Sequence, residues 1–411
     1  MFARVDYVVI VFGASIGVAL AILTHPYVFS SKPLPPGALV GVAVGGLVFL
    51  VAWVLNRSKF AHPPHLRNDT PVGNNVPKAT RRGRKKGDYC VKLTKEFEKL
   101  SGPKKFSYKE LMTVTDSFAD DRILGRGGFG IVYEGHLGDT RTRTRVAVKI
   151  INPDSRQGIK EYISEVKSLS QLRHRNLVLL IGYCHEANKF ILVYEFIGGG
   201  SLEDHLFKRK PLLTWERRYN TALGLASALH YLHKQCNQCV IHRDIKSSNV
   251  MLDEKFVAKL GDFGLARLVD HTRAPKTTQV KGTPGYLAPE CYQTGKASKE
   301  SDIYSFGVVL LEIVCGRRVF DSELAEQGLG LVQWVWKHYG YRSWRRNFLL
   351  AVDQRLGKDV DKKQAEALMM AGLWCAHPIA ESRPSIEEAM AVLNLKAEPP
   401  KLPSKMPSFN I

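Results

Sequence analysis

Three oxygen-bearing side chains lie in two short motifs near the middle of the 411-residue chain. The stretch HRDIKSSN, residues 242–249, places the carboxylate of Asp244 five residues before the amide of Asn249, and DFG begins thirteen residues later at Asp262. A carboxylate can position a hydroxyl and accept its proton, while carboxylate and amide oxygens are hard ligands that suit Mg²⁺. We therefore expect Asp244 to act as a proton acceptor, and Asn249 and Asp262 to hold magnesium beside phosphates.

A glycine-rich stretch lies upstream of these motifs. Gly125, Gly127 and Gly130 form G-x-G-x-x-G, and Val132 follows two residues later. Glycines allow a backbone to approach phosphates without a side-chain clash. In a dinucleotide-binding fold this motif runs from a strand into a helix, whereas here residues 131–133 are of strand type. The pattern predicts a strand–turn–strand flap over a nucleotide.

A lysine ends the next apolar run. Residues 146–149 read VAVK, so that Ala147 lies within the run and Lys149 follows Gly130 by nineteen residues. A lysine there can bind the α- and β-phosphates, and its burial without a partner would be costly. We expect Glu165, on a following helix, to pair with it, and Glu161, one turn earlier, is the alternative.

Each of these motifs has an ordinary structural explanation when taken alone. Lys149 could extend its head to solvent, Asp244 could cap a helix, and the glycines could form turns. Together, in this order and with APE at 288–290, they predict phosphoryl transfer from a nucleotide to a hydroxyl. The alternative is a pseudokinase scaffold, which would be indicated by loss of Lys149, Asp244 or Asp262, and all three are present.

The elements that would position these residues extend from about Phe106 to about Leu395. Short β-type runs come first (131–133, 145–151, 190–195), and longer helical patterns follow (215–233, 302–316, 365–376, 385–393). This order predicts an α+β body with two lobes. The apolar stretch 303–315 is short and contains Glu312, so we expect a buried helix there.

Two apolar segments precede this body. Residues 37–55 form a nineteen-residue stretch without charge, followed by Arg57 and Lys59. That length suffices to cross a bilayer, and the flanking cations predict that everything after Leu55 is cytoplasmic. A buried core helix is the alternative. Residues 1–36 contain a second apolar segment, which is either a signal peptide or another membrane helix.

The charge of the chain is uneven. The formal net charge is +20, and residues 56–105 hold fourteen Lys/Arg and four Asp/Glu. This Pro-containing stretch has the composition of a linker, and five of its cations cluster within 81–86. It could bind nucleic acid or an anionic membrane leaflet; its position beside a membrane helix favours the leaflet, so no nucleic-acid partner is expected.

Seven cysteines, an odd number without framework spacing, indicate reduced thiols in the cytosol. Cys236 and Cys239 form a single C-x-x-C. Because no second pair completes four ligands, we expect two loop thiols and no zinc site.

The stretches KKFSYKEL (104–111), GIKEY (158–162), LGLASAL (223–229) and GLWCAHP (372–378) carry a family resemblance. The chain resembles plant receptor-like serine/threonine protein kinases, and most of all the L-type lectin-domain receptor kinases. The resemblance implies a bilobal kinase fold with a β-rich N-lobe and a helical C-lobe. It also implies ATP, with Mg²⁺ or alternatively Mn²⁺, and plasma-membrane localisation.

The resemblance also implies roles for individual residues. Asp244 would be the catalytic base and Lys246 would lie near the γ-phosphate, with Asn249 as a further catalytic and metal-binding residue. Asp302 would fix the catalytic loop, and Arg383 would pair with Glu290. The ATP site would comprise Gly125, Gly127, Gly130, Val132, Ala147, Lys149, Glu165, the gatekeeper Tyr194, and Glu195 and Ile197 of the hinge.

Lys246 is typical of serine/threonine kinases in this family, so protein serine and threonine hydroxyls are the expected substrates. Arg243 beside Asp244 indicates control by activation-loop phosphorylation. The candidate sites are Thr277, Thr278 and Thr283.

The predicted organisation has five parts: an N-terminal segment (1–36), a membrane helix (37–55), a basic linker (56–117), a kinase domain (118–394) and an irregular tail (395–411). The family's lectin ectodomain is not found in this sequence, and Pro284 replaces a larger apolar residue of the family. Partners expected from the resemblance are protein substrates and the bilayer, with homo- or hetero-dimerisation with other receptor kinases left open.

Overall fold

The computed structural model describes residues 96–408 except for 98–99, 101, 128–129, 139–141, 153–154, 187–188, 209, 270–280 and 341–347. All of the described residues belong to one compact unit, Lys78–Ile411. The predicted segments 1–36 and 37–55 and most of the 56–117 linker lie outside the described residues, as do Thr277 and Thr278.

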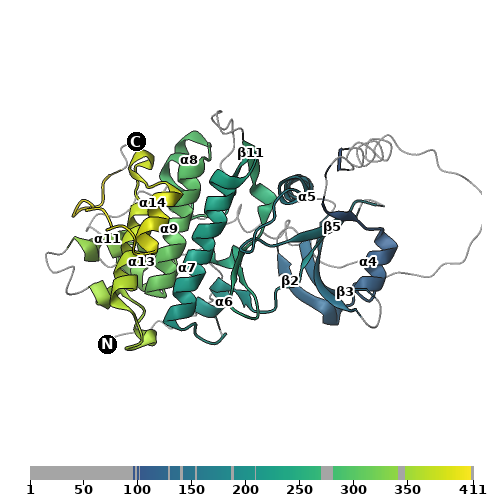
Figure 1. The fold of residues 1–411 in the computed structure, drawn as a ribbon, viewed down its shortest axis with the longest axis horizontal. Coiled ribbons are helices and arrows are strands. Elements are labelled where there is room, and N and C mark those ends of the chain that lie inside the picture. Colours follow the sequence, from purple (N-terminus) through teal and green to yellow (C-terminus); the bar gives the residue numbers. More distant parts are fainter. Residues whose placement is uncertain are drawn as a thin grey trace, which may run out of the picture. The chain divides into compact units, whose positions relative to one another are not determined.

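A six-stranded sheet forms the first lobe (Figure 1). Its order is β1-β5-β6-β4-β3-β2, and every neighbouring pair is antiparallel except β1 and β5. The strands are β1 (Lys104–Lys105), β2 (Ile123–Gly127), β3 (Gly130–Leu137), β4 (Thr144–Ile151), β5 (Leu180–Cys184) and β6 (Phe190–Glu195).

The alternation of β4 sets the two faces of this sheet. Val146 and Val148 are buried on one face, where they share a core with Leu111 of α4 (Tyr108–Val114). Because successive side chains point to opposite faces, Ala147 and Lys149 lie on the other face, together with α5 (Arg156–Leu169). The strand therefore presents its lysine to the side on which α5 packs.

Residues 104–117, which the sequence assigned to the linker, are folded onto this lobe. Ser107 and Glu110 form a reciprocal capping box that starts α4. Phe106 and Leu111 are both buried in the core beneath the sheet. Two buried apolar side chains thus attach this segment to the lobe.

The second lobe is mainly helical (Figure 1). Its helices are α6 (Leu202–Phe207), α7 (Trp215–His230), α8 (Pro289–Thr294), α9 (Lys299–Cys315), α10 (Ser322–Glu326), α11 (Leu331–Tyr339), α13 (Lys362–Cys375) and α14 (Ile386–Leu393), and α7 continues as a π-helical turn, Tyr231–Gln235. A short 3₁₀ turn, Asp120–Arg122, lies in the first lobe, and the other short 3₁₀ turns are Ser247–Asn249, Phe263–Leu265, Phe348–Ala351, Gln354–Leu356 and Ala380–Ser382.

Helix α9 lies at the centre of this lobe. It begins at a capping box formed by Ser298 and Ser301, and it ends at Gly316, which adopts the left-handed conformation (φ 62°). Every residue from Ser301 to Cys315 is buried, as predicted for the apolar stretch 303–315. None of the helices in the described residues combines the length and apolar character that a membrane span requires.

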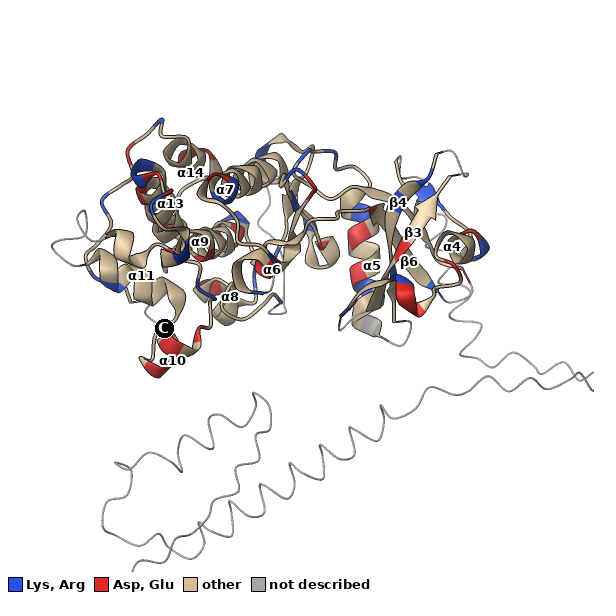
Figure 2. Cartoon of the chain, turned by 90° about the horizontal axis from the view of Figure 1, so that it is seen from below, with Lys and Arg blue, Asp and Glu red and all other residues tan. Residues whose placement is uncertain are grey.

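Two small sheets carry the loops between the lobes. One contains β7 (Gly200–Ser201), β9 (Val250–Leu252) and β10 (Ala258–Leu260); the other pairs β8 (Cys239–Ile241) with β11 (Arg267–Val269). Figure 2 shows acidic and basic residues over the elements of both lobes. The two-lobed α+β architecture predicted from the order of strands and helices is confirmed.

The tail after α14 has no helix or strand up to residue 408, yet it packs against α11. The indole of Trp336 donates to the carbonyl of Pro403 at 2.9 Å, and the hydroxyl of Tyr339 donates to the carbonyl of Leu402 at 3.1 Å. The described part of the tail is therefore irregular in conformation but held in place.

Candidate active site

Lys149, Glu165 and Asp262 meet where the two lobes face each other. The ammonium of Lys149 lies 3.3 Å from a carboxylate oxygen of Glu165 and 3.6 Å from one of Asp262. The Glu165 side chain is 1% exposed. Its neighbour Glu161 instead accepts a hydrogen bond from Gln157 at 2.7 Å, so of the two predicted glutamates it is Glu165 that contacts the lysine.

The charges of this cluster depend on one another. Burial acts to lower the pKa of Lys149, but Glu165 and Asp262 outweigh it and raise the pKa above its ordinary value. Burial raises the pKa of Glu165 to about 7 against the effect of Lys149. Burial opposes the ionisation of Asp262, yet Lys149 keeps its pKa below the usual range. The cluster therefore keeps a charged amine facing two carboxyl groups.

Tyr194 adds a contact that sequence reasoning missed. It lies opposite Ala147 in the β4–β6 ladder, and its hydroxyl donates to the second carboxylate oxygen of Glu165. Strand β6 ends one residue later at Glu195, whose carboxylate accepts from the backbone N–H of Leu179 at 2.8 Å. The predicted hinge residues Glu195–Ile197 thus continue directly from the strand that carries Tyr194.

The glycine-rich motif forms the β2–β3 hairpin. Gly127 pairs with Gly130, and Val132 pairs with Lys149 on β4. A Cβ at Gly130 would collide with the carbonyl of Ile150, whereas one at Gly125 or Gly127 would meet no atom of the described residues within 4 Å. Packing requires glycine only at 130, so the space beside the other two glycines is open to a ligand.

Buried Asp302 fixes the loop that carries Asp244. One of its carboxylate oxygens accepts from the backbone N–H of His242 at 2.7 Å, and the other accepts from Arg243 at 2.8 Å. Arg243 has a φ of 73°, a conformation that is uncommon for a residue other than glycine. The pair of hydrogen bonds from α9 holds this strained turn.

Asp244 lies at the centre of a polar network. The ammonium of Lys246 donates to Asp244 at 2.8 Å and to the hydroxyl of Thr283 at 3.0 Å. That hydroxyl donates to the other carboxylate oxygen of Asp244 at 2.6 Å. The contact joins residues 39 positions apart in the sequence, and no motif spacing predicted it.

The donor set suits a hard cation bound together with phosphates. The amide N–H₂ of Asn249 donates to the backbone carbonyl of Asp244 at 2.8 Å, so its Oδ1 is the atom left for a metal. Asp262 adopts a left-handed φ of 61° beside Lys149. Among the described residues, no three His, Cys, Asp or Glu side chains cluster as metal ligands. One carboxylate and one amide fit Mg²⁺, which keeps water and phosphate oxygens as its remaining ligands.

The side chain of Arg243 is 8% exposed, and its buried Nε has no hydrogen-bond partner in the described part of the chain. Burial and neighbouring Arg267 lower its pKa. The ammonium of Lys281 donates to the side-chain oxygen of Gln157 on α5 at 2.9 Å, and burial and the charge of Arg243 lower its pKa.

An ion pair and a pair of hydrogen bonds hold the segment after Thr283 in place. Arg383 donates to both carboxylate oxygens of Glu290 at 2.7 Å, as the family resemblance implied. The Tyr286 hydroxyl lies 2.9 Å from both oxygens of Glu312 on α9, and burial raises the pKa of Glu312 to about 8. Nothing in the sequence singled out Glu312 as a partner of Tyr286.

This fold and this arrangement of residues define a protein kinase. The model of the protein tyrosine and serine/threonine kinase family matches residues 118–393. The chain belongs to this family, and the prediction of a protein kinase is confirmed. Members of the family generally use ATP with Mg²⁺ or Mn²⁺.

Several plant receptor kinases are similar to the chain. The L-type lectin-domain containing receptor kinases IX.1 and IX.2 of Arabidopsis thaliana are 48% and 47% identical to the chain; each alignment covers 90% of this chain, and 54% and 53% of the relatives. The receptor kinase SIT2 of Oryza sativa subsp. japonica is 44% identical, over 78% of this chain and 47% of its own. The chain spans about half the length of these relatives, and the predicted resemblance is confirmed.

Proposed function

We propose that the chain transfers the γ-phosphate of ATP to serine and threonine hydroxyls of proteins. The observation that carries this proposal is the network in which Asp244 contacts both Lys246 and Thr283. Asp244 accepts the proton of the substrate hydroxyl. At the same time the oxygen of that hydroxyl bonds to the γ-phosphorus of ATP, and the bond between the γ-phosphorus and ADP breaks. Lys246 balances the negative charge at the transferring group.

The opposite wall of the site binds the nucleotide. Lys149 contacts the α- and β-phosphates and is oriented by Glu165; Gly125 and Gly127 leave room for the phosphates. Tyr194, Glu195 and Ile197 border the adenine, with Val132 and Ala147 beside it. Asn249 and Asp262 hold Mg²⁺ or Mn²⁺, which neutralises phosphate charge when bound.

The test is radiolabelled phosphate transfer by Asp244→Asn, compared with Asp359→Asn. Asp359 is an exposed carboxylate outside the site. We expect the first variant to lose at least about 10²-fold in rate, because general base catalysis contributes on that scale. The control should match wild type. A fully active Asp244→Asn would refute the mechanism, and an inactive wild-type chain would favour the pseudokinase scaffold.

The proposal includes control by phosphorylation of Thr277 or Thr278. It is supported by the buried Arg243 Nε without a partner among the described residues, since a phosphate could pair with it. Thr283 suits this role less well, because its hydroxyl already contacts Asp244 and Lys246. Replacing Thr277 and Thr278 by alanine should lower activity and remove the phosphopeptide detected by mass spectrometry.

Membrane anchoring is also part of the proposal, with residues 37–55 as the span and the kinase domain in the cytoplasm at the plasma membrane. It is supported by the apolar segment, the adjacent cations, and the naming of the relatives as receptor kinases. The same naming supports pairing with a second receptor kinase, to be tested by light scattering on the detergent-solubilised chain. The proposed organisation is completed by the predicted linker 56–117, whose residues 104–117 are folded onto the first lobe, a kinase domain 118–394 and a tail 395–411.

The basic linker provides a separate test. A peptide covering 56–105 should bind phosphatidylserine vesicles, and neutralising the five cations within 81–86 should weaken that binding, since each such charge contributes about 1 kcal/mol near an anionic surface. Unchanged vesicle binding at low salt, or tighter binding to a DNA duplex than to vesicles, would contradict the role at the leaflet.

A further inference from the structure

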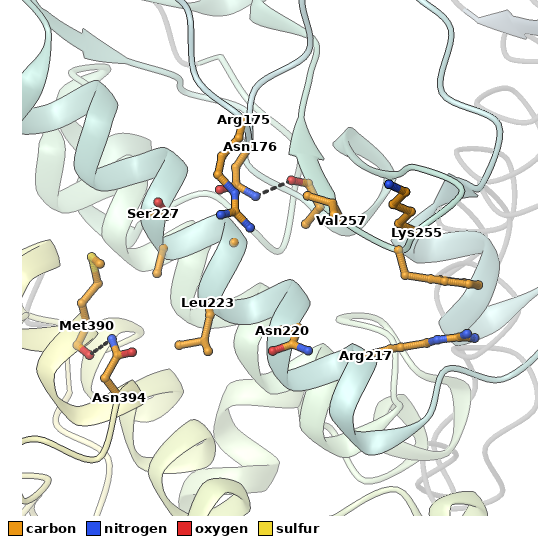
Figure 3. A pocket seen from close by; sticks show the side chains of 14 residues that line it. Arg175, Asn176, Arg217, Asn220, Leu223, Ser227, Lys255, Val257, Met390 and Asn394 are labelled. Atoms are coloured by element: carbon orange, nitrogen blue, oxygen red, sulfur yellow. Dashed lines mark hydrogen bonds between the residues drawn. The ribbon is translucent and has the colours of Figure 1, made fainter.

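A pocket of about 510 Å³ opens on the helical lobe, apart from the residues of the phosphoryl-transfer site (Figure 3). Helix α7 lines it along one side; the turn between β9 and β10, the loop after α5 and helix α14 complete it. None of its fourteen lining residues belongs to the site described above. Its chemistry therefore needs a separate explanation.

The lining of this pocket is positively charged. It contains Arg175, Arg217 and Lys255, and no aspartate or glutamate is among the lining residues. All three cations are exposed, and within the described parts of the chain none of them forms an ion pair with a carboxylate. These charges are available to an anionic partner.

The β9–β10 turn carries one of these cations, Lys255. Asp253 lies in the turn, where its carboxylate accepts from the backbone N–H groups of Lys255 and Val257, both at 2.8 Å, and it is not among the residues that line the pocket. Phe256 adopts a left-handed φ of 61°, which is strained for an aromatic residue. The turn thus presents Lys255 and the Phe256 ring next to α7.

Arg217 stacks on that ring, with its guanidinium carbon 3.6 Å from the ring centre. Stacking holds the guanidinium plane while its N–H groups stay directed outward along their edges. This geometry is prepared to receive a carboxylate, because little side-chain freedom remains to be lost on binding.

The charges lie at two places along α7. Gly224 is seven residues, or about 10.5 Å, along the helix from Arg217, and the amide of Asn176 lies close against Gly224. Figure 3 shows Arg175 beside Asn176 at one end of the pocket and Arg217 toward the other, and Lys255 precedes Phe256, on whose ring Arg217 stacks. A single phosphate would not contact both places, whereas carboxylates about three residues apart on an extended chain would.

Apolar groups lie between and beside the charges. Leu223 and Met390 are half-buried, and both line the pocket. A purely ionic ligand would leave these side chains uncovered, but an apolar side chain within an acidic segment would cover them.

We infer that this pocket is a docking site for an extended acidic segment of a partner protein, with carboxylates at both ends and an apolar residue between them. Arg217 and Lys255 bind one end, Arg175 binds the other, and Leu223 and Met390 contact the apolar residue. This interaction surface is additional to phosphoryl transfer and does not depend on it.

The probe is a fluorescein-labelled peptide with two glutamates on either side of a leucine, and the readout is fluorescence anisotropy with the full chain in detergent. The test variant combines Arg175→Glu, Arg217→Glu and Lys255→Glu. The control combines Lys109→Glu, Lys189→Glu and Lys401→Glu, which are exposed residues outside the pocket. Both variants change the net charge of the chain by the same amount. Any binding of the probe to the basic linker therefore affects the two measurements equally.

We expect the pocket variant to raise the Kd about tenfold or more relative to the control variant. Replacing the central leucine of the probe by serine should weaken binding to wild type but not to the pocket variant. Equal Kd values for the two variants would overturn the inference. So would undiminished binding of the serine probe, or displacement by equimolar inorganic phosphate, which would indicate a site for polyanions or small anions. Autophosphorylation of each variant shows that it is folded and reports on the kinase proposal independently.

Discussion

The hydroxyl of Thr283 offers a sharp test of how the transfer site works. This hydroxyl donates a hydrogen bond to Asp244 at 2.6 Å and accepts one from Lys246 at 3.0 Å. Thr283 itself is neither the proposed catalytic base nor a charged group. Thr283→Val keeps the shape of the side chain and removes both contacts, whereas Thr283→Ser keeps the hydroxyl. A hydrogen bond to a charged partner contributes about 1.5–3 kcal/mol. If one such contact is lost from the transition state, kcat falls about 10-fold to 150-fold.

The assay is the initial rate of transfer from radiolabelled ATP to casein over a range of ATP concentrations. We expect Thr283→Val to lower kcat with little change in the KM for ATP, since Thr283 makes no contact with Lys149. Thr283→Ser should retain most of the activity. Wild-type kcat in Thr283→Val, or a Ser variant as slow as the Val variant, would refute the proposed positioning role.

Three further predictions concern the buried charges. Lys149→Ala should reduce kcat/KM by about 10²–10³-fold in the same assay, because a preorganised donor to the phosphates is lost; equal activity would contradict its role. Arg383→Ala should lower the free energy of unfolding by about 3–5 kcal/mol in urea, because Glu290 loses a bidentate partner whose side chain is 0% exposed; a loss below 1 kcal/mol, on the scale of a surface pair, would contradict this. For Glu312, with a pKa raised to about 8, the folded chain keeps a proton that the unfolded chain releases. The free energy of unfolding of wild type should therefore fall relative to that of Glu312→Gln as pH rises from about 4.5 to about 8. If the difference between the two free energies of unfolding does not vary over this range, Glu312 is ionised in the folded chain.

The contacts that could be predicted from the sequence are those that follow from the periodicity and the order of the elements. The alternation of β4 determines that Lys149 lies on the face opposite Val148, and a helix after it can reach that face with Glu165. The same reasoning located α9, because an apolar run with one glutamate is too short for a membrane. These contacts depend on the local period of each element.

Other contacts were not predictable because they depend on where loops pass. The Thr283–Asp244 hydrogen bond joins the segment before α8 to the loop that carries Asp244, and the Tyr286–Glu312 pair joins the same segment to α9. No spacing rule applies across such distances in sequence. The fixed position of the tail likewise follows from Trp336 and Tyr339 on α11, which became visible as partners only in three dimensions.

The proposed gatekeeper position of Tyr194 matters for chemical genetics. Shrinking a gatekeeper to glycine is a means of admitting bulky inhibitors or ATP analogues, but here the same ring supplies a hydroxyl to Glu165. Removing it would leave one oxygen of a carboxylate that is 1% exposed without its donor, next to the lysine that it orients. A variant with glycine at this position would therefore also lose the hydrogen bond that helps to orient Glu165. Tyr194→Phe removes the hydroxyl without enlarging the pocket, so it separates the two effects.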